Sequence, residues 1–139
     1  KFGKAIISPE LSSLELEKFK NKDFIAFVHG KIRLMTLAHE IKEGKMRDER
    51  GFNFNINKIY NGAEITNEKE LGLFNKLRSL LHSGINQFYI DTEENLEEIL
   101  KVYRAIIDGK SLDVSELQKK YVLAEYICVH LCLKKRICG

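Results

Sequence analysis

The chain has 139 residues, of which 44% are hydrophobic and 31% are charged, and its 23 basic and 20 acidic residues give a net charge of +3. These values are typical of one soluble globular domain, well short of the roughly 250 residues of a complete eight-stranded β/α barrel. Because basic and acidic residues are interspersed, no basic face indicates nucleic-acid binding, although the composition allows it.

The hydropathy of the chain predicts a cytoplasmic protein without a membrane segment. No apolar run approaches the roughly 18 residues that cross a bilayer, and no basic segment followed by an apolar one opens the chain as in a signal peptide. The chain starts at Lys1 rather than at a methionine and enters an apolar strand almost at once. We therefore expect a fragment of a longer protein or a processed product.

The first part of the chain predicts a βαβ unit. Residues 4–8 form a short apolar run rich in β-branched residues, which is typical of a buried parallel strand, and Pro9 ends it. A capping-box pattern at residues 12–15 starts a helix. Residues 24–28 then form a second buried strand, which ends at His29-Gly30.

An antiparallel hairpin is predicted next. Residues 38–51 form a polar, charged loop, and residues 52–56 alternate between apolar and polar side chains with period two. Asn61-Gly62 is the dipeptide that favours a type I′ turn, and the chain returns up to Thr66. The hairpin over residues 52–66 is thus inserted between α/β units.

The segment from Asn67 to Gly109 predicts a helix, a strand and a second helix. Asn67 is a good N-cap for a helix whose apolar residues recur up to Leu81, and Gly84 suits its C-terminus. Residues 85–91 predict a strand, and Thr92 predicts the cap of the helix that runs to Gly109. A short helix is predicted over residues 115–120. The sequence pattern alone therefore indicates an α/β fold.

Short blocks in a fixed order carry a resemblance to a known family. They are Ile7–Ser12, Phe27–Gly30 with Leu34-Met35, Asp48–Phe52, Asn67–Leu71, Ser83–Ile85 with Phe88–Asp91, and Tyr103–Ala105. In this order they resemble the later part of the catalytic domain of the collagenase-like peptidase family, also called peptidase family U thirty-two. The resemblance spans the chain from about Lys4 to Gly109.

The resemblance implies a fold and a function. Members look like (β/α)-barrel proteins; some are described as peptidases, others serve oxygen-independent hydroxylation of RNA bases or of a quinone precursor, and several hold an iron–sulfur cluster. We expect a partial (β/α) barrel of parallel strands over residues 1–109, with the antiparallel hairpin inserted at 52–66, and a divergent tail over 110–139. The expected activity is cleavage of peptide or protein substrates, with no cofactor.

The sequence departs from the family at the cluster positions. Ile25 stands where the family signature has an acidic residue, and Arg33 and Glu40 stand where it has cysteines. Iron–sulfur clusters are held by thiolates, so the resemblance does not extend to a cluster here. Further on, Ala124-Glu125 replaces the Gly-His pair that follows a tyrosine in the family.

The cysteines of this chain lie in the divergent tail. Cys128, His130, Cys132 and Cys138 offer soft metal ligands, but their spacing does not match paired Cys-x-x-Cys zinc sites. Apolar neighbours favour buried structural thiols instead. We predict no metal site.

Side chains at the carboxyl ends of the predicted parallel strands are the candidate catalytic residues. If these strands build part of a barrel, Glu10, His29 and Asp91 share one mouth, where barrel active sites lie. His29 could act as acid or base, while Glu10 or Asp91 could orient it or polarise a water. The structural alternative is that both carboxylates cap helices and that His29 is a hydrogen-bonded strand end.

Asp48 and Arg50 are the candidate substrate-binding residues, at the entrance to the hairpin. Arg50 could bind a carboxylate or phosphate with two hydrogen bonds while Asp48 fixes its geometry. The alternative is a loop ion pair that pins the hairpin.

The function predicted first is that of a peptidase or a fragment of one, although no serine-hydrolase or zinc-helix motif names its nucleophile. The alternatives are a hydroxylation protein of the same family and a non-catalytic interaction or scaffold module. Parallel strands with open edges predict a homo-oligomer or pairing with the remainder of a longer chain.

Overall fold

The computed structural model describes residues 4–7, 18 and 23–121, which fall into two compact units. We call one the sheet A unit (Lys1–Gly30 with Leu71–Gly139) and the other the sheet B unit (Lys31–Glu70). Sheet B therefore belongs to a segment that leaves the sheet A unit after Gly30 and returns at Leu71.

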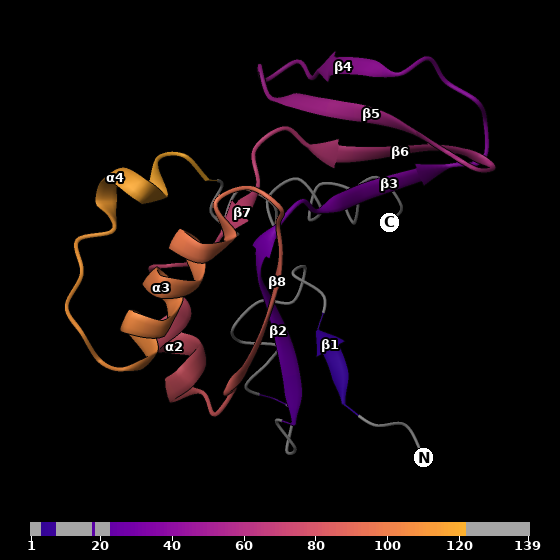
Figure 1. Ribbon diagram of the computed structural model, residues 1–139. Helices are drawn as coiled ribbons and strands as arrows, with labels where there is room; N and C mark the ends of the chain where they lie inside the picture. The colour runs from indigo at the N-terminus through magenta and orange to yellow at the C-terminus, as the bar shows by residue number, and fades with distance from the viewer. Residues whose placement is uncertain (1–3, 8–17, 19–22, 122–139) are drawn as a thin grey trace. The chain divides into compact units, whose positions relative to one another are not determined.

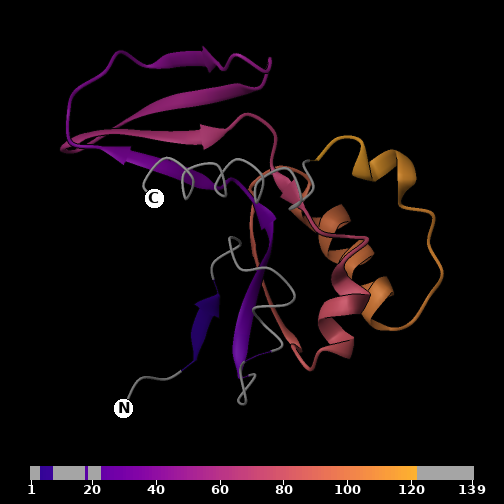
Figure 2. The same ribbon diagram turned by 180° about the vertical axis from the view of Figure 1, so that it is seen from behind.

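Sheet A is built around strand β2 (Phe24–Gly30). Strands β1 (Ala5–Ile7) and β8 (Gln87–Asp91) pair with β2 in parallel, and the short strand β7 (Leu71–Gly72) pairs with its last two residues in antiparallel fashion (Figures 1 and 2). Parallel strands were predicted at these three places, and their parallel pairing is confirmed. The predicted burial of the first strand is wrong, because Ala5 and Ile6 are exposed. The helix predicted from residue 12 lies outside the described residues.

The sheet A unit also holds helices α2 (Leu77–His82), α3 (Leu96–Ile107) and α4 (Ser115–Gln118). Helices α2 and α3 lie side by side in both views (Figures 1 and 2). α3 turns Ile99, Tyr103 and Ile106 inward. The largest fully buried apolar side chains are Val28, Leu71, Phe74, Leu77, Ile85 and Ile99, and all of them belong to this unit.

The two helix starts predicted within residues 67–109 were wrong, whereas the helix predicted over residues 115–120 does begin at Ser115. Asn67 is the last residue of a strand rather than an N-cap, and the helix begins only at Leu77. Leu71 and Gly72 instead extend β2's pairing as strand β7, because β2 offers unpaired backbone groups at its end. Asn95, in a left-handed conformation and without a side-chain capping bond, occupies the N-cap position of the next helix in place of Thr92.

The sheet B unit is a four-stranded antiparallel sheet with the order β3-β6-β5-β4. Its strands are β3 (Arg33–Leu37), β4 (Gly44–Arg47), β5 (Asn53–Ile59) and β6 (Gly62–Asn67). β5 and β6 confirm the predicted hairpin at residues 52–66. The polar segment predicted as a loop contains β4, whose four exposed residues pair with β5.

The β5–β6 turn differs from the predicted type I′. Its two loop residues, Tyr60 and Asn61, lack the positive φ that this type needs at both central positions. Gly62 has φ +148°, and a Cβ there would lie 1.9 Å from the Leu37 carbonyl oxygen. The glycine is therefore required by the approach of β3 rather than by the turn type.

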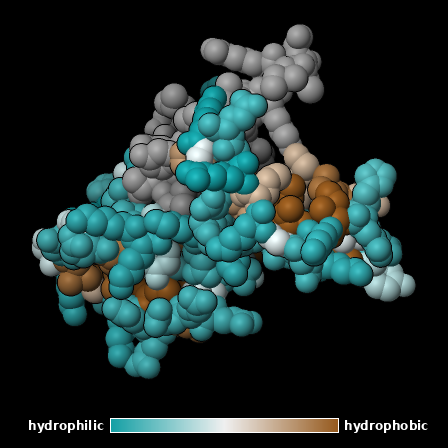
Figure 3. Space-filling model, turned by 90° about the horizontal axis from the view of Figure 1, so that it is seen from above, coloured by the Kyte–Doolittle hydropathy of each residue, from teal (hydrophilic) through white to brown (hydrophobic). Residues whose placement is uncertain are grey.

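The chain thus combines a mainly parallel sheet with helices and a separate antiparallel sheet, and its described strands form no closed barrel. No described helix is long and apolar enough to cross a membrane. Hydrophilic residues dominate the surface seen in Figure 3, where hydrophobic residues gather in patches.

Candidate functional site

His29 lies near the carboxyl end of β2, and its side chain is completely buried. The imidazole is surrounded by aromatic rings: its centroid lies 4.6 Å from that of Tyr121, 5.5 Å from Phe74 and 5.8 Å from Tyr103. Tyr103 comes from α3, so the histidine joins the strand to the helix that covers it.

The Tyr103 hydroxyl determines which nitrogen of His29 carries the proton. It donates its single hydrogen to the Val28 carbonyl oxygen at 2.8 Å and accepts from the Leu73 N–H at 3.1 Å. His29 Nδ1 lies 3.3 Å from the Tyr103 hydroxyl oxygen. Because the hydroxyl hydrogen is already used, Nδ1 must be the donor, which leaves Nε2 as the basic nitrogen of the neutral ring.

Burial controls the ionisation of both side chains. Desolvation lowers the pKa of His29 from 6.5 to about 4, since a charged imidazole is disfavoured away from water. Burial also raises the pKa of the Tyr103 phenol well above its usual range. At neutral pH the pair is therefore an uncharged hydrogen-bonded unit. It links β2, α3 and the backbone before α2.

Asp91 ends β8 and is exposed to solvent. In the β2–β8 register it pairs with Gly30, while His29 pairs with Ile90. Because successive side chains of a strand point to opposite faces, the Asp91 carboxylate lies on the face opposite the His29 ring. The structure thus places the two predicted site residues on neighbouring strands without bringing their side chains together. Glu10 lies outside the described residues.

Asp48 and Arg50 belong to the tight connection between β4 and β5. Asp48 Oδ1 accepts hydrogen bonds from the main-chain N–H of Arg50 at 3.0 Å and of Phe52 at 2.8 Å. Gly51, with φ +88°, completes the turn. Asp48 therefore stabilises the turn through main-chain atoms and fixes the position from which the Arg50 side chain extends.

Arg33 and Glu40, where the resemblance would place cysteine ligands, are charged residues that are paired within the sheet B unit. Arg33 Nε lies 2.8 Å from Glu64 Oε2, and the Glu40 carboxylate lies 4.0 Å from Lys58 Nζ. A guanidinium has no lone pair to give to iron, so these residues do not fit an iron–sulfur cluster. Among the described residues no three His, Cys, Asp or Glu side chains gather as metal ligands. The cysteine tail lies outside them.

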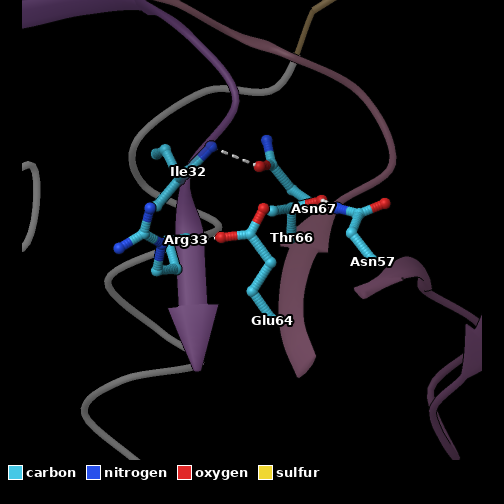
Figure 4. Close-up of polar contacts among 6 residues, drawn as sticks. All are labelled: Ile32, Arg33, Asn57, Glu64, Thr66 and Asn67. Carbon is cyan, nitrogen blue, oxygen red and sulfur yellow. Dashed lines mark hydrogen bonds and ion pairs between the residues drawn. The ribbon is translucent and has the colours of Figure 1, made fainter. Parts of the chain in front are cut away.

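Asn67, which was predicted to cap a helix, is instead a structural residue at the end of β6. Its Oδ1 accepts a hydrogen bond from the Ile32 N–H at 2.6 Å (Figure 4). The Asn67 main-chain N–H donates to the Ile32 carbonyl oxygen, and its Nδ2 donates to the Lys69 carbonyl oxygen. Asn67 is only 7% exposed. It therefore joins residues near the start and the end of the sheet B unit. Such a contact between residues distant in sequence cannot be predicted from a local pattern.

We expect Asn67→Ala to destabilise the sheet B unit by about 1–2 kcal/mol, since the buried Ile32 N–H loses its acceptor. Hydrogen exchange of the Ile32 amide is the measurement, and its protection should fall markedly. Asn57→Ala is the matched control, because the Asn57 amide makes one half-buried bond of 3.3 Å to Thr66. Equal Ile32 protection in the two variants would contradict this role.

Comparison with protein-family models, with curated proteins and with solved structures gave no significant match for this chain.

Proposed function

We propose that this chain is part of a β/α protein of the collagenase-like peptidase type that acts on peptide or protein substrates in the cytoplasm. The parallel strands β1, β2 and β8, with α3 following β8, support the proposal, because a strand followed by a packed helix is the repeating unit of a (β/α) barrel. On this proposal sheet A is a partial barrel into which sheet B is inserted.

The observation that carries a catalytic role is the solvent-accessible carboxylate of Asp91 at the carboxyl end of a parallel strand. Active sites of β/α proteins lie at this end of the strands. A carboxylate there can accept a proton from an attacking water or orient a substrate N–H. Glu10, which follows β1, is proposed to join it at the same end.

His29 has a different role in this proposal. A ring with no exposed surface cannot contact a substrate, and its lowered pKa keeps it neutral. His29 is then a positioning residue, which fixes the end of β2 next to Asp91 through Tyr103. Arg50, which extends from the Asp48 turn in the sheet B unit, is proposed separately to bind a carboxylate group.

A peptide-hydrolysis assay tests the catalytic role of Asp91. We expect Asp91→Asn to lower turnover by about a hundredfold, which is the usual loss on removing a general base, without changing the thermal unfolding of the protein. Asp108→Asn, an exposed carboxylate at the end of α3 that pairs with Arg104, is the control and should keep full activity. An active Asp91→Asn variant would rule out this role.

A non-catalytic interaction module is the second candidate, and the complete burial of His29 favours it. In that case the wild-type protein cleaves no peptide, and His29→Gln changes stability alone. The hydrolysis assay separates the two functions, because only a peptidase shows turnover that depends on Asp91.

A further inference from the structure

Helix α3 has a second apolar face that the sheet A unit does not cover. Leu96, Leu100 and Ile107 are 42%, 47% and 39% exposed. Their spacing of four and seven residues places them along one stripe, next to the buried stripe of Ile99, Tyr103 and Ile106. An exposed apolar stripe of this kind on a helix is the usual mark of an interaction surface.

A shallow groove of about 480 Å³ runs beside this stripe. Leu100 and Ala105 supply its apolar part, and the charged residues Glu97, Lys101, Arg104 and Asp108 line its sides. Among the charged residues of the groove, Glu97 and Arg104 lie nearest the apolar stripe on the helical wheel, because each is one turn from Leu100. These two residues flank the surface that a partner would contact.

The charged residues of α3 and of the segments next to it are distributed unevenly along the helix axis. Glu93, Glu94, Glu97 and Glu98 lie at the amino-terminal end, while Lys101, Arg104 and Lys110 lie toward the carboxyl end, with Asp108 as the exception. Such a helix is complementary to a second copy of itself in the opposite direction. In that arrangement Glu97 of one copy faces Arg104 of the other, and the reverse pair forms by symmetry.

We propose that α3 pairs antiparallel with α3 of a second copy of this chain, through Leu96, Leu100 and Ile107. The partner is inferred from charge complementarity: a helix with this pattern repels a parallel copy and matches a reversed one. Because one 12-residue helix buries less area than a standard protein interface, the dimer is weak and depends on concentration.

Sedimentation velocity of the full chain over a wide concentration range tests the dimer. The wild-type protein should shift from monomer to dimer as its concentration rises, and Leu100→Glu should remain a monomer. Leu112→Glu is the matched control, because Leu112 is equally exposed at 44% but lies outside α3. A wild-type monomer at every concentration, or a Leu100→Glu dimer, overturns the proposal.

A charge exchange tests the direction of the pair. Glu97→Arg should raise the dissociation constant about tenfold, since two symmetric contacts become repulsive, and Glu97→Arg with Arg104→Glu should restore it. The double variant places charge unfavourably for the helix dipole at both ends, so recovery cannot come from a more stable helix. A double variant that dimerises no better than the single one overturns the antiparallel arrangement.

Discussion

Replacing Gly30 with alanine should lower the free energy of unfolding of the sheet A unit by about 3 kcal/mol, through two separate effects. Gly30 has φ +135°, a conformation that residues with a side chain rarely adopt. A Cβ there would also lie 2.3 Å from the carbonyl oxygen of Asp91. That oxygen is backbone in the paired strand β8, so it cannot move away without disturbing the β2–β8 ladder.

Two other glycines separate these effects. Gly109 has φ +78° but nothing within 4 Å of its would-be Cβ, so Gly109→Ala measures the backbone cost alone. Gly44 has neither feature, and Gly44→Ala should change stability little. Urea unfolding followed by circular dichroism gives all three values. If Gly30→Ala lowers the free energy of unfolding no more than Gly109→Ala does, the contact between Gly30 and the Asp91 carbonyl oxygen does not limit the side chain at position 30.

The outcome also bears on the proposed site. Gly30 allows the end of β8 to approach β2 closely, and this approach sets where the Asp91 carboxylate emerges. A variant that folds with a displaced β8 should therefore lose peptide hydrolysis together with stability, whereas Gly44→Ala should lose neither.

The parallel strands could be predicted because each contains a short run of β-branched or aromatic residues, which is visible without knowledge of the partner strand. The exposure of β1 could not be predicted in this way, because it depends on what packs against the strand. The start of α2 could not be predicted in this way. Leu71 lies in register with Gly30, 41 residues earlier in the chain, and this long-range pairing overrides the local helical spacing.

The same distinction between local patterns and long-range contacts applies to the candidate site. The position of Asp91 at the exposed end of β8 could be predicted, because the residue directly follows an apolar run. The role of Tyr103 could not be found, since its hydroxyl meets Val28 and Leu73, which are distant in sequence. Its place in the apolar stripe of α3 predicted burial alone. Likewise, Asp48 bonds to main-chain groups, and a sequence motif cannot separate that from an ion pair with Arg50.

Acid should destabilise this protein through His29, by about 2 kcal/mol between pH 7 and pH 5. The folded-state pKa of about 4 lies below the value of 6.5 expected for an exposed histidine, so the unfolded chain binds the proton first. Stability from the neutral, buried ring is complete above about pH 6.5 and is lost as the pH falls toward 4. The lowered pKa values of Glu68 and Asp113 act below this window, since their ordinary values are 4.5 and 3.8.

Urea unfolding of the wild type and of His29→Gln at pH 7 and pH 5 measures this contribution. The glutamine side chain is neutral at both values, so the variant should lose much of the pH dependence while being less stable at pH 7. His82→Gln removes an exposed imidazole and should keep the wild-type slope. If the pH dependence of unfolding is unchanged in His29→Gln, another group must bind the proton that destabilises the fold. A slope that depends on His29 means that the ring stays neutral inside the protein, where it holds Tyr103 rather than exchanging protons with a substrate.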